Sequence, residues 1–156
     1  MRILAIDPGY VASASLVYLT ESRTITEARL QTNGSLLESL VGLRDQTDLL
    51  AIEMMQCFGM PVGREVLETC VWIGKFIERY HRASVYVYRK DVKMYLCRSM
   101  RATDANIRAA LIDMFGPGKD AAVGTKKAPG PLYGIKRDLW SAVSVGVTAA
   151  HEGEPR

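Results

Sequence analysis

The stretch that decides the fold is Arg2-Ile-Leu-Ala-Ile-Asp7-Pro8-Gly9-Tyr10, where four apolar residues end on a carboxylate followed at once by Pro-Gly. Its bulky apolar residues fall on both parities of an extended chain, so we expect a strand covered on both faces, as in the centre of a helix-flanked sheet. Pro8 cannot donate a ladder hydrogen bond and Gly9 permits a tight turn, so the strand stops there. Asp7 is therefore expected at the carboxyl end of a central strand, where such sheets place their chemistry. Taken alone, the residue is equally well explained as an acid that caps a turn.

The composition is that of an ordinary globular protein. The chain has 156 residues, of which 48% are apolar and 24% charged, and this predicts one domain over 1–156 with a substantial core. No apolar run approaches a membrane span and no signal-peptide pattern is present, so we expect an intracellular protein. Cys57, Cys70 and Cys97 form no Cys-x-x-Cys pair, which predicts neither a disulfide framework nor a zinc site. The net charge of +3 is mild, but bases cluster in the second half.

The first third of the chain predicts strands and one short helix. Three strand-like segments at 2–7, 12–19 and 24–30, with short connections, predict an antiparallel meander whose first hairpin loop is 20–23. Leucines at helical spacing predict a helix over 34–43, with Ser35 as its N-cap. The segment 48–53, Asp-Leu-Leu-Ala-Ile-Glu, repeats the opening pattern, so a second buried strand is expected to end on a second acid, Glu53.

The middle of the chain predicts three helices and a strand. The loop 54–63 is unusually apolar, and the helix at 64–80 carries an apolar stripe wider than one face. That helix either buries one side on the sheet and another against a partner or lies wholly inside. A strand follows at 84–88, then helices at 89–97 and 104–115, the last with Thr103 or Asp104 as its N-cap and Gly116-Pro117 as its stop.

The end of the chain combines a basic segment with a final helix. Residues 116–137 contain five glycines, three prolines and five bases against one acid, which predicts a long basic loop of functional importance. The helix at 138–151 is expected to turn Trp140, Val143, Val147 and Ala150 inward, leaving 152–156 as a tail.

Three acids from distant parts of the chain are the candidate chemistry. Asp7 and Glu53 end two strands that can lie side by side, and Asp138 falls in the first turn of the last helix, after a basic lead-in. Clustered carboxylates without histidines or thiolates suit Mg²⁺ or Mn²⁺, and two such ions can clamp a phosphoryl displacement. Without metal, mutual repulsion would raise their pKa values. The alternative for Asp138 is a helix-start acid stabilised by the macrodipole.

Several motifs together resemble the RuvC-type Holliday junction resolvases, and the phage-encoded members in particular. They are the opening Ile-Asp-Pro-Gly, the Ala-Ile-Glu at 51–53, the lead-in Thr125-Lys-Lys-Ala-Pro-Gly-Pro-Leu-Tyr-Gly-Ile-Lys136, and the Asp-Leu-Trp-Ser-Ala at 138–142. The likeness covers nearly the whole chain in order. It implies an α/β ribonuclease H-like fold with a mixed five-stranded sheet flanked by helices, in a homodimer. The implied activity is that of a Mg²⁺-dependent endonuclease that nicks opposed strands of a four-way DNA junction in recombination and repair, in the cytoplasm of a bacterial or phage-infected cell.

The resemblance also implies roles for single residues. It assigns metal ligation to Asp7, Glu53 and Asp138, with two Mg²⁺ ions, or Mn²⁺ in their place, in each active site. Ser141 stands where the family usually has a second acid, so a water held by Ser141 or another carboxylate would complete the site. Lys93 falls where members often carry a lysine near the active centre, and it either stabilises charge on the phosphorane or contacts a phosphate.

Substrate contacts and a partner are expected elsewhere. Phosphates should be tracked by eight bases, namely Arg89, Lys90, Arg98, Arg101, Lys126, Lys127, Lys136 and Arg137. Phe58 with Met55 or Met60 is expected to wedge open the junction crossover, unless the loop is a lid on the core. A two-fold dimer is expected through the helix at 64–80 with its Trp72 and Phe76.

Other classes remain open at this stage. One is a DNA-structure-binding module without hydrolysis, and another is a nuclease of the same fold that acts on a different nucleic acid, such as RNA–DNA hybrids. The start also loosely resembles actin-like sugar kinases and ATPases, but those chains are far longer. No membrane partner and no small-molecule cofactor are expected.

Overall fold

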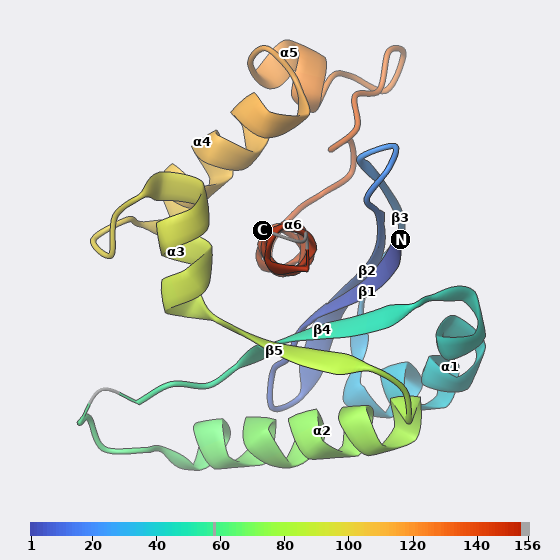
Figure 1. Ribbon diagram of the computed structural model, residues 1–156, viewed down its shortest axis with the longest axis vertical. Helices are drawn as coiled ribbons and strands as arrows, with labels where there is room; N and C mark the ends of the chain where they lie inside the picture. The colour runs from blue at the N-terminus through green and yellow to red at the C-terminus, as the bar shows by residue number, and fades with distance from the viewer. Residues whose placement is uncertain (58, 154–156) are drawn as a thin grey trace.

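The structure is a computed structural model that describes residues 1–57 and 59–153 (Figure 1). Its strands and helices follow in the order β1 (Arg2–Asp7), β2 (Ala12–Leu19), β3 (Thr24–Thr32), α1 (Asn33–Gln46), β4 (Leu49–Met54), α2 (Arg64–Tyr80), β5 (Ser84–Tyr88), α3 (Arg89–Cys97), α4 (Asp104–Phe115), α5 (Lys119–Ala122) and α6 (Leu139–Glu152). Within these described residues, no helix is both long and apolar enough to cross a lipid bilayer.

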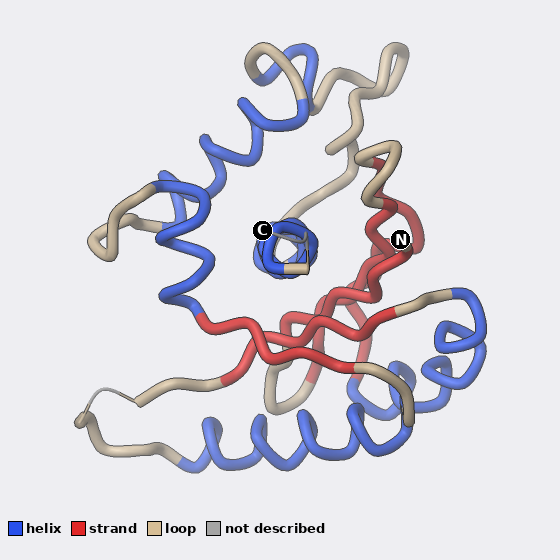
Figure 2. The backbone as a smooth tube through the Cα atoms, in the orientation of Figure 1, coloured by secondary structure: helices blue, strands red, loops and turns tan. Residues whose placement is uncertain are grey.

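The strands form one mixed five-stranded sheet in the order β3-β2-β1-β4-β5 (Figure 2). The first three strands pair antiparallel, so the predicted meander is confirmed. β4 returns to lie parallel to β1, and β5 lies parallel to β4. The opening stretch therefore occupies the centre of the sheet, and the strands that carry Asp7 and Glu53 are direct neighbours.

Helices cover both faces of the sheet (Figure 1). Ile3 and Ala5 belong to the core beneath α6, α3 and α4, whereas Leu4 and Ile6 belong to the core beneath α1 and α2. All four side chains are fully buried. Apolar residues on both parities of β1 are thus explained by a core on each side, as predicted.

The N-cap predicted for α1 is wrong by three residues. The cap is Thr32, whose hydroxyl accepts a hydrogen bond from the Ser35 backbone amide at 3.3 Å. Threonine and serine are both common N-cap residues, so either position fits the local pattern. The N-cap of α4 is Thr103, one of the two predicted residues, and it forms a capping box with Asn106.

The helix α2 buries only one side. Ile73, Phe76 and Tyr80 are buried against the sheet side, whereas Leu67 and Val71 are 58% and 57% exposed. The wholly internal alternative is therefore excluded. Phe76 is fully buried and stacks on half-buried Trp72 with ring centroids 5.8 Å apart. Phe76 is therefore a core residue, and the expectation that it contacts a partner is wrong.

The segment 116–137 is not the coreless loop that its composition predicted. It contains α5, and Ala122, Leu132 and Ile135 are buried in the core beneath α6. Gly130 packs so closely that a Cβ there would lie 2.3 Å from the Ala121 carbonyl oxygen. The three buried residues follow no helical or strand period, and for that reason the pattern did not reveal them.

The final helix is buried on most of its sides, in the middle of the layer beneath α3 and α4 (Figure 1). Val143 and Val147 are buried as predicted, whereas Trp140 and Ala150 are only half-buried. Small residues such as Gly146, whose Cβ position lies 3.2 Å from the Ala5 Cβ, let the helix approach β1 closely. The N-terminus of α6 is thereby held near the carboxyl end of β1.

Candidate active site

Asp7 and Glu53 meet at one edge of the sheet. Ile6 on β1 pairs with Ile52 on β4, so the two acids that follow leave neighbouring parallel strands at the same level. Glu53 is only 8% exposed and Asp7 is half-buried. Their carboxyl groups lie close enough to influence the pKa of each other.

Burial dominates the electrostatics of this pair. It raises the pKa of Asp7 to about 8, with further contributions from the negative charges of Glu53 and Asp138, while the positive charge of Arg89 acts in the opposite direction. Burial also raises the pKa of Glu53, against the lowering effect of Arg89 and of the hydrogen bond from Asp7. In the absence of a bound cation, the pair therefore carries a proton near neutral pH.

Asp138 lies just before the last helix and not in its first turn, because α6 begins at Leu139 with Asp138 as its N-cap residue. It is exposed, and Arg137 before it has a left-handed backbone with φ of 50°. Its charge contributes to the raised pKa of Asp7, which places the third acid at the same edge. In the part of the chain that the structure describes, no three His, Cys, Asp or Glu side chains are grouped closely enough to hold a metal ion.

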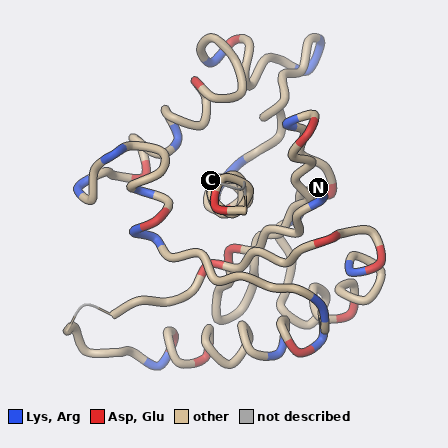
Figure 3. The backbone as a smooth tube through the Cα atoms, viewed as in Figure 1, with Lys and Arg blue, Asp and Glu red and all other residues tan. Residues whose placement is uncertain are grey.

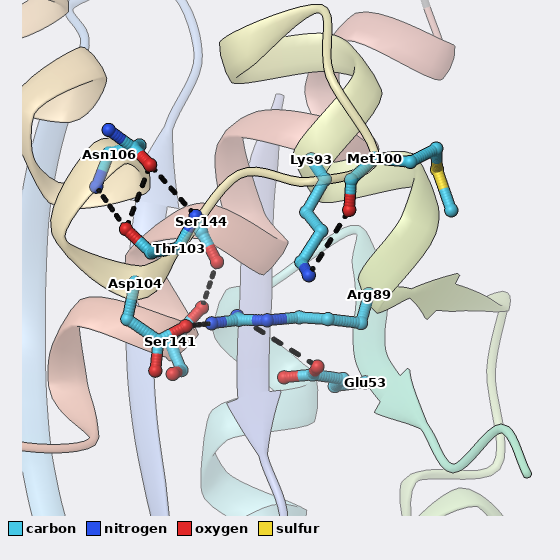
Figure 4. A network of polar contacts seen from close by, with 9 residues as sticks. All are labelled: Glu53, Arg89, Lys93, Met100, Thr103, Asp104, Asn106, Ser141 and Ser144. Atoms are coloured by element: carbon cyan, nitrogen blue, oxygen red, sulfur yellow. Dashed lines mark hydrogen bonds and ion pairs between the residues drawn. The ribbon is translucent and has the colours of Figure 1, made fainter.

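Arg89 connects the buried pair to the surface (Figure 4). One guanidinium nitrogen lies 4.0 Å from a Glu53 carboxylate oxygen, and another forms an ion pair with exposed Asp104. The sequence predicted Arg89 only as one of several phosphate contacts and Asp104 only as a possible helix cap. Fifteen residues separate the two, and only the packing of α3 against α4 brings them together.

A cleft of about 360 Å³ opens beside Arg89 and the N-terminus of α6. Its polar lining comes from Arg89, Asp104, Arg108, Arg137, Asp138 and Ser141. Arg108 was not predicted, and its guanidinium lies 4.5 Å from the centre of the Trp140 ring. The one feature of the sequence that could have indicated Arg108 is its position four residues after Asp104, on the same side of a helix. Three cations and two acids thus line an open space, and one of the cations, Arg89, also contacts Glu53.

Lys93 and Ser141 lie near this cleft in different roles. Lys93 reaches across to the α3–α4 connection, where its ammonium group donates a hydrogen bond of 3.5 Å to the Met100 carbonyl (Figure 4). Ser141 lines the cleft and is half-buried, three residues after Asp138. Asp104 is the further carboxylate that the structure brings close, since its charge helps to raise the pKa of Glu53.

The other predicted phosphate contacts lie on several exposed segments of the second half of the chain (Figure 3). Lys126 and Lys127 form the tip of a turn closed by a hydrogen bond of 3.0 Å from the Thr125 amide to the Ala128 carbonyl. Arg98 and Arg101 lie on the exposed α3–α4 connection. Lys90 sits over the Tyr88 ring at 5.6 Å, and Lys136 is exposed just before Arg137.

The wedge residues fall on the loop after Glu53. Phe58 lies outside the described residues. Met55 is half-buried and packs against the core beneath α1 and α2, as the lid alternative requires, whereas Met60 is 74% exposed. Of the described candidates, Met60 therefore offers the most surface to a substrate.

The mixed five-stranded sheet, with helices on both faces, defines an α/β fold of the ribonuclease H-like type. No protein-family model matches the sequence, and no curated protein matches it significantly. Solved structures of RuvC from Thermus thermophilus are similar to it. One RuvC structure aligns over 96% of this chain and 93% of its own, with 15% identity and a TM-score of 0.68. A second, RuvC in complex with a Holliday junction substrate, aligns over 98% of this chain and 96% of its own, again with 15% identity and a TM-score of 0.68. The predicted fold is thus confirmed: the chain has the fold of RuvC.

Proposed function

We propose that this protein is a metal-dependent endonuclease that resolves four-way DNA junctions by nicking two opposed strands. It acts as a homodimer in the cytoplasm of a bacterial or phage-infected cell. The observation that carries the proposal is the pair of half-buried Asp7 and buried Glu53 on adjacent parallel strands in a RuvC fold. The similar structure solved with a Holliday junction substrate supports the choice of DNA.

The donor set fits a hard divalent cation. Asp7, Glu53 and Asp138 offer carboxylate oxygens only, which are the ligands that Mg²⁺ and Mn²⁺ prefer. Burial and repulsion raise the pKa of Asp7 to about 8, so the site is short of positive charge and a cation there would replace a proton. When bound, a pair of such ions supplies polarisation of the phosphate and a water of lowered pKa.

The chain's own groups then bind and orient the substrate. Arg89 lines the cleft and lies 4.0 Å from Glu53, so it holds the position of that carboxylate and offers further N–H groups to a phosphate oxygen. Ser141 offers a hydroxyl group to a water beside Asp138. Lys93 releases its hydrogen bond to the Met100 carbonyl and stabilises the negative charge that develops on the phosphate during hydrolysis.

The exposed bases supply sequence-independent affinity for DNA. The Lys126–Lys127 turn and the α3–α4 connection carry exposed positive charge, which suits a polyanion with several phosphates. Met60, which is exposed on the loop after Glu53, presses on the bases at the crossover, where stacking is already interrupted.

Two copies are required if two opposed strands are to be cut. The exposed face of α2 supports this interface, because Leu67 and Val71 lie four residues apart and are both more than half exposed. Leu67→Glu combined with Val71→Glu should convert the dimer to a monomer in sedimentation experiments and leave the fold intact. A wild-type protein that sediments as a monomer at micromolar concentration would contradict the dimer.

The deciding experiment compares cleavage of a synthetic four-way junction with that of duplex DNA, an RNA–DNA hybrid and single-stranded DNA, with Mg²⁺ and with EDTA. We expect paired nicks in the junction with Mg²⁺ alone. Junction binding without cleavage under any metal condition would identify a DNA-structure-binding module instead. Preferential cleavage of the hybrid would identify a ribonuclease H-like nuclease with another substrate.

A further inference from the structure

Two buried polar side chains lie beneath the turn that follows Asp7, and the proposed chemistry does not use them. Ser13 on β2 and Asn33 at the start of α1 are each only 1% exposed. Polar groups buried this deeply are costly unless they are hydrogen-bonded. The bonds they form therefore show what they hold in place.

Both residues bind the turn residue Gly9. The Ser13 hydroxyl donates to the Asn33 side-chain carbonyl at 2.6 Å and accepts from the Gly9 amide at 3.2 Å. The Asn33 side-chain amide donates to the Gly9 carbonyl at 2.8 Å, and its backbone amide donates to the Val11 carbonyl at 3.1 Å. Both polar backbone groups of Gly9 are thus paired with groups that are themselves fixed inside the protein.

The geometry of this turn leaves little freedom. A Cβ at Gly9 would lie 2.4 Å from the Ala12 carbonyl oxygen, so only glycine fits there. Pro8 restricts the backbone between Gly9 and Asp7. A shift of Gly9 is therefore transmitted through one rigid residue to Asp7.

Asp7 needs such support once it is ionised, as metal binding requires, because the negative charges beside it then repel it. The negative charges of Glu53 and Asp138 both act on it, and Arg89, which is the nearby cation, makes its ion pairs with Glu53 and Asp104. A carboxylate at a strand end can relieve repulsion by moving away when its turn deforms. A buried hydrogen-bonded clamp on that turn opposes the movement.

We propose that Asn33, acting with Ser13, is a positioning residue that holds the Pro8–Gly9 turn so that Asp7 stays in place beside Glu53 to bind a divalent cation. The proposal deepens the function given above, on which it rests. It goes beyond it because neither residue is a metal ligand or a phosphate contact.

The test compares Asn33→Ala with Thr47→Val, a control at the other end of α1. Thr47 is 3% exposed and donates to the Leu43 carbonyl at 2.7 Å, so the control also loses a buried hydrogen bond but lies away from the turn. Mn²⁺ binding is measured with the metal alone by electron paramagnetic resonance, and junction cleavage is measured as kcat and KM.

We expect Asn33→Ala to weaken Mn²⁺ binding and to lower kcat, each by about 10-fold or more, because outer groups that orient metal ligands have effects of this size. KM for the junction should not change. Thr47→Val should match the wild type in both measurements. Ser13→Ala, which removes a smaller group from the same clamp, gives the same comparison if Asn33→Ala does not fold.

The outcomes separate the two ideas. If Asn33→Ala and Ser13→Ala bind Mn²⁺ and cleave like Thr47→Val, the clamp is only structural and the proposal is overturned. If the wild type binds Mn²⁺ but cleaves no nucleic acid, the proposed function fails, while the Mn²⁺ comparison still decides the role of Asn33. A wild type that binds no Mn²⁺ at all would overturn both.

Discussion

Asp7 and Glu53 lie side by side but are held in different ways. Glu53 is the penultimate residue of β4 and has a cation within 4.0 Å, the Arg89 guanidinium, which is fixed from the outside by Asp104. Asp7 ends β1, and the turn after it is held from beneath by Ser13 and Asn33 through hydrogen bonds to Gly9. Glu53 thus has a direct ion pair, whereas Asp7 is held through the backbone of the turn that follows it.

This difference shows how two like charges can be kept adjacent. A second cation next to Asp7 would compete with a metal ion for the same carboxylates. A clamp made of neutral groups restrains Asp7 without neutralising it. The carboxylate pair therefore keeps a net demand for positive charge, which is the property that a cation site needs.

The largest expected effect is the loss of cleavage when any one of the three acids is neutralised. Asp7→Asn, Glu53→Gln and Asp138→Asn should each reduce junction cleavage below detection, because each removes a proposed metal ligand. Junction binding, measured by gel shift in EDTA, should remain or become tighter, since less negative charge faces the phosphates. Full activity in one variant would remove that residue from the site.

The next largest effect should separate the cation from its outer partner. Arg89→Gln should lower kcat by about 100-fold, because a group that stabilises charge in the transition state has effects of that order. Asp104→Asn breaks only an exposed ion pair and should stay within about 3-fold of the wild type. Single-turnover cleavage at saturating Mg²⁺ measures both. If the two variants lost the same factor in kcat, Arg89 would act only when its ion pair with Asp104 is formed.

Stability without metal should distinguish the two acids in a pH-dependent way. The pKa of Asp7 in the folded protein is about 8, above its ordinary value of 3.8. The folded state is therefore stabilised while Asp7 is protonated, and the protein loses this stability as the pH rises toward and through 8. In EDTA at pH 9, Asp7→Asn should therefore melt about 3–6 °C above the wild type. The difference should shrink toward pH 4.

Glu53→Gln is the matched comparison for that experiment. Burial also raises the pKa of Glu53, but the positive charge of Arg89 opposes this shift. Replacing Glu53 by glutamine would also remove an ion-pair partner of the Arg89 guanidinium. Its gain in melting temperature at pH 9 should therefore be smaller than that of Asp7→Asn. Both melting temperatures are measured by calorimetry. Equal gains for the two variants would show that Arg89 does not support Glu53.

The smallest effect is expected from cations remote from both acids. Lys126→Ala with Lys127→Ala should weaken binding to junction, duplex and single-stranded DNA alike, and should reduce the slope of log affinity against log salt by about 2 for duplex DNA. The rate of cleavage at saturating substrate should not change. If only junction binding weakened, the turn would be reading the shape of the junction.

The sequence predicted the regular elements well because their signals are local. Alternation, both-parity apolar runs and Pro-Gly stops identified β1, β2 and β5 with their observed bounds, and α2, α3 and α4 as well. The same signals put Asp7 and Glu53 at strand ends. The errors at Ser35 and in 116–137 arose where one local pattern fits several residues, or where apolar anchors such as Leu132 lack a period.

The supports of the two acids could not be read from the sequence. Asn33 lies 24 residues from Gly9, and Arg89 lies 36 residues after Glu53, so neither contact leaves a pattern in a short window. Sequence alone therefore determined which residues end the central strands, because turn and strand preferences act between neighbours. Only the tertiary structure decided that a buried asparagine holds one acid and an arginine the other, because these contacts exist only once the start of α1 and the start of α3 are packed at the ends of the sheet.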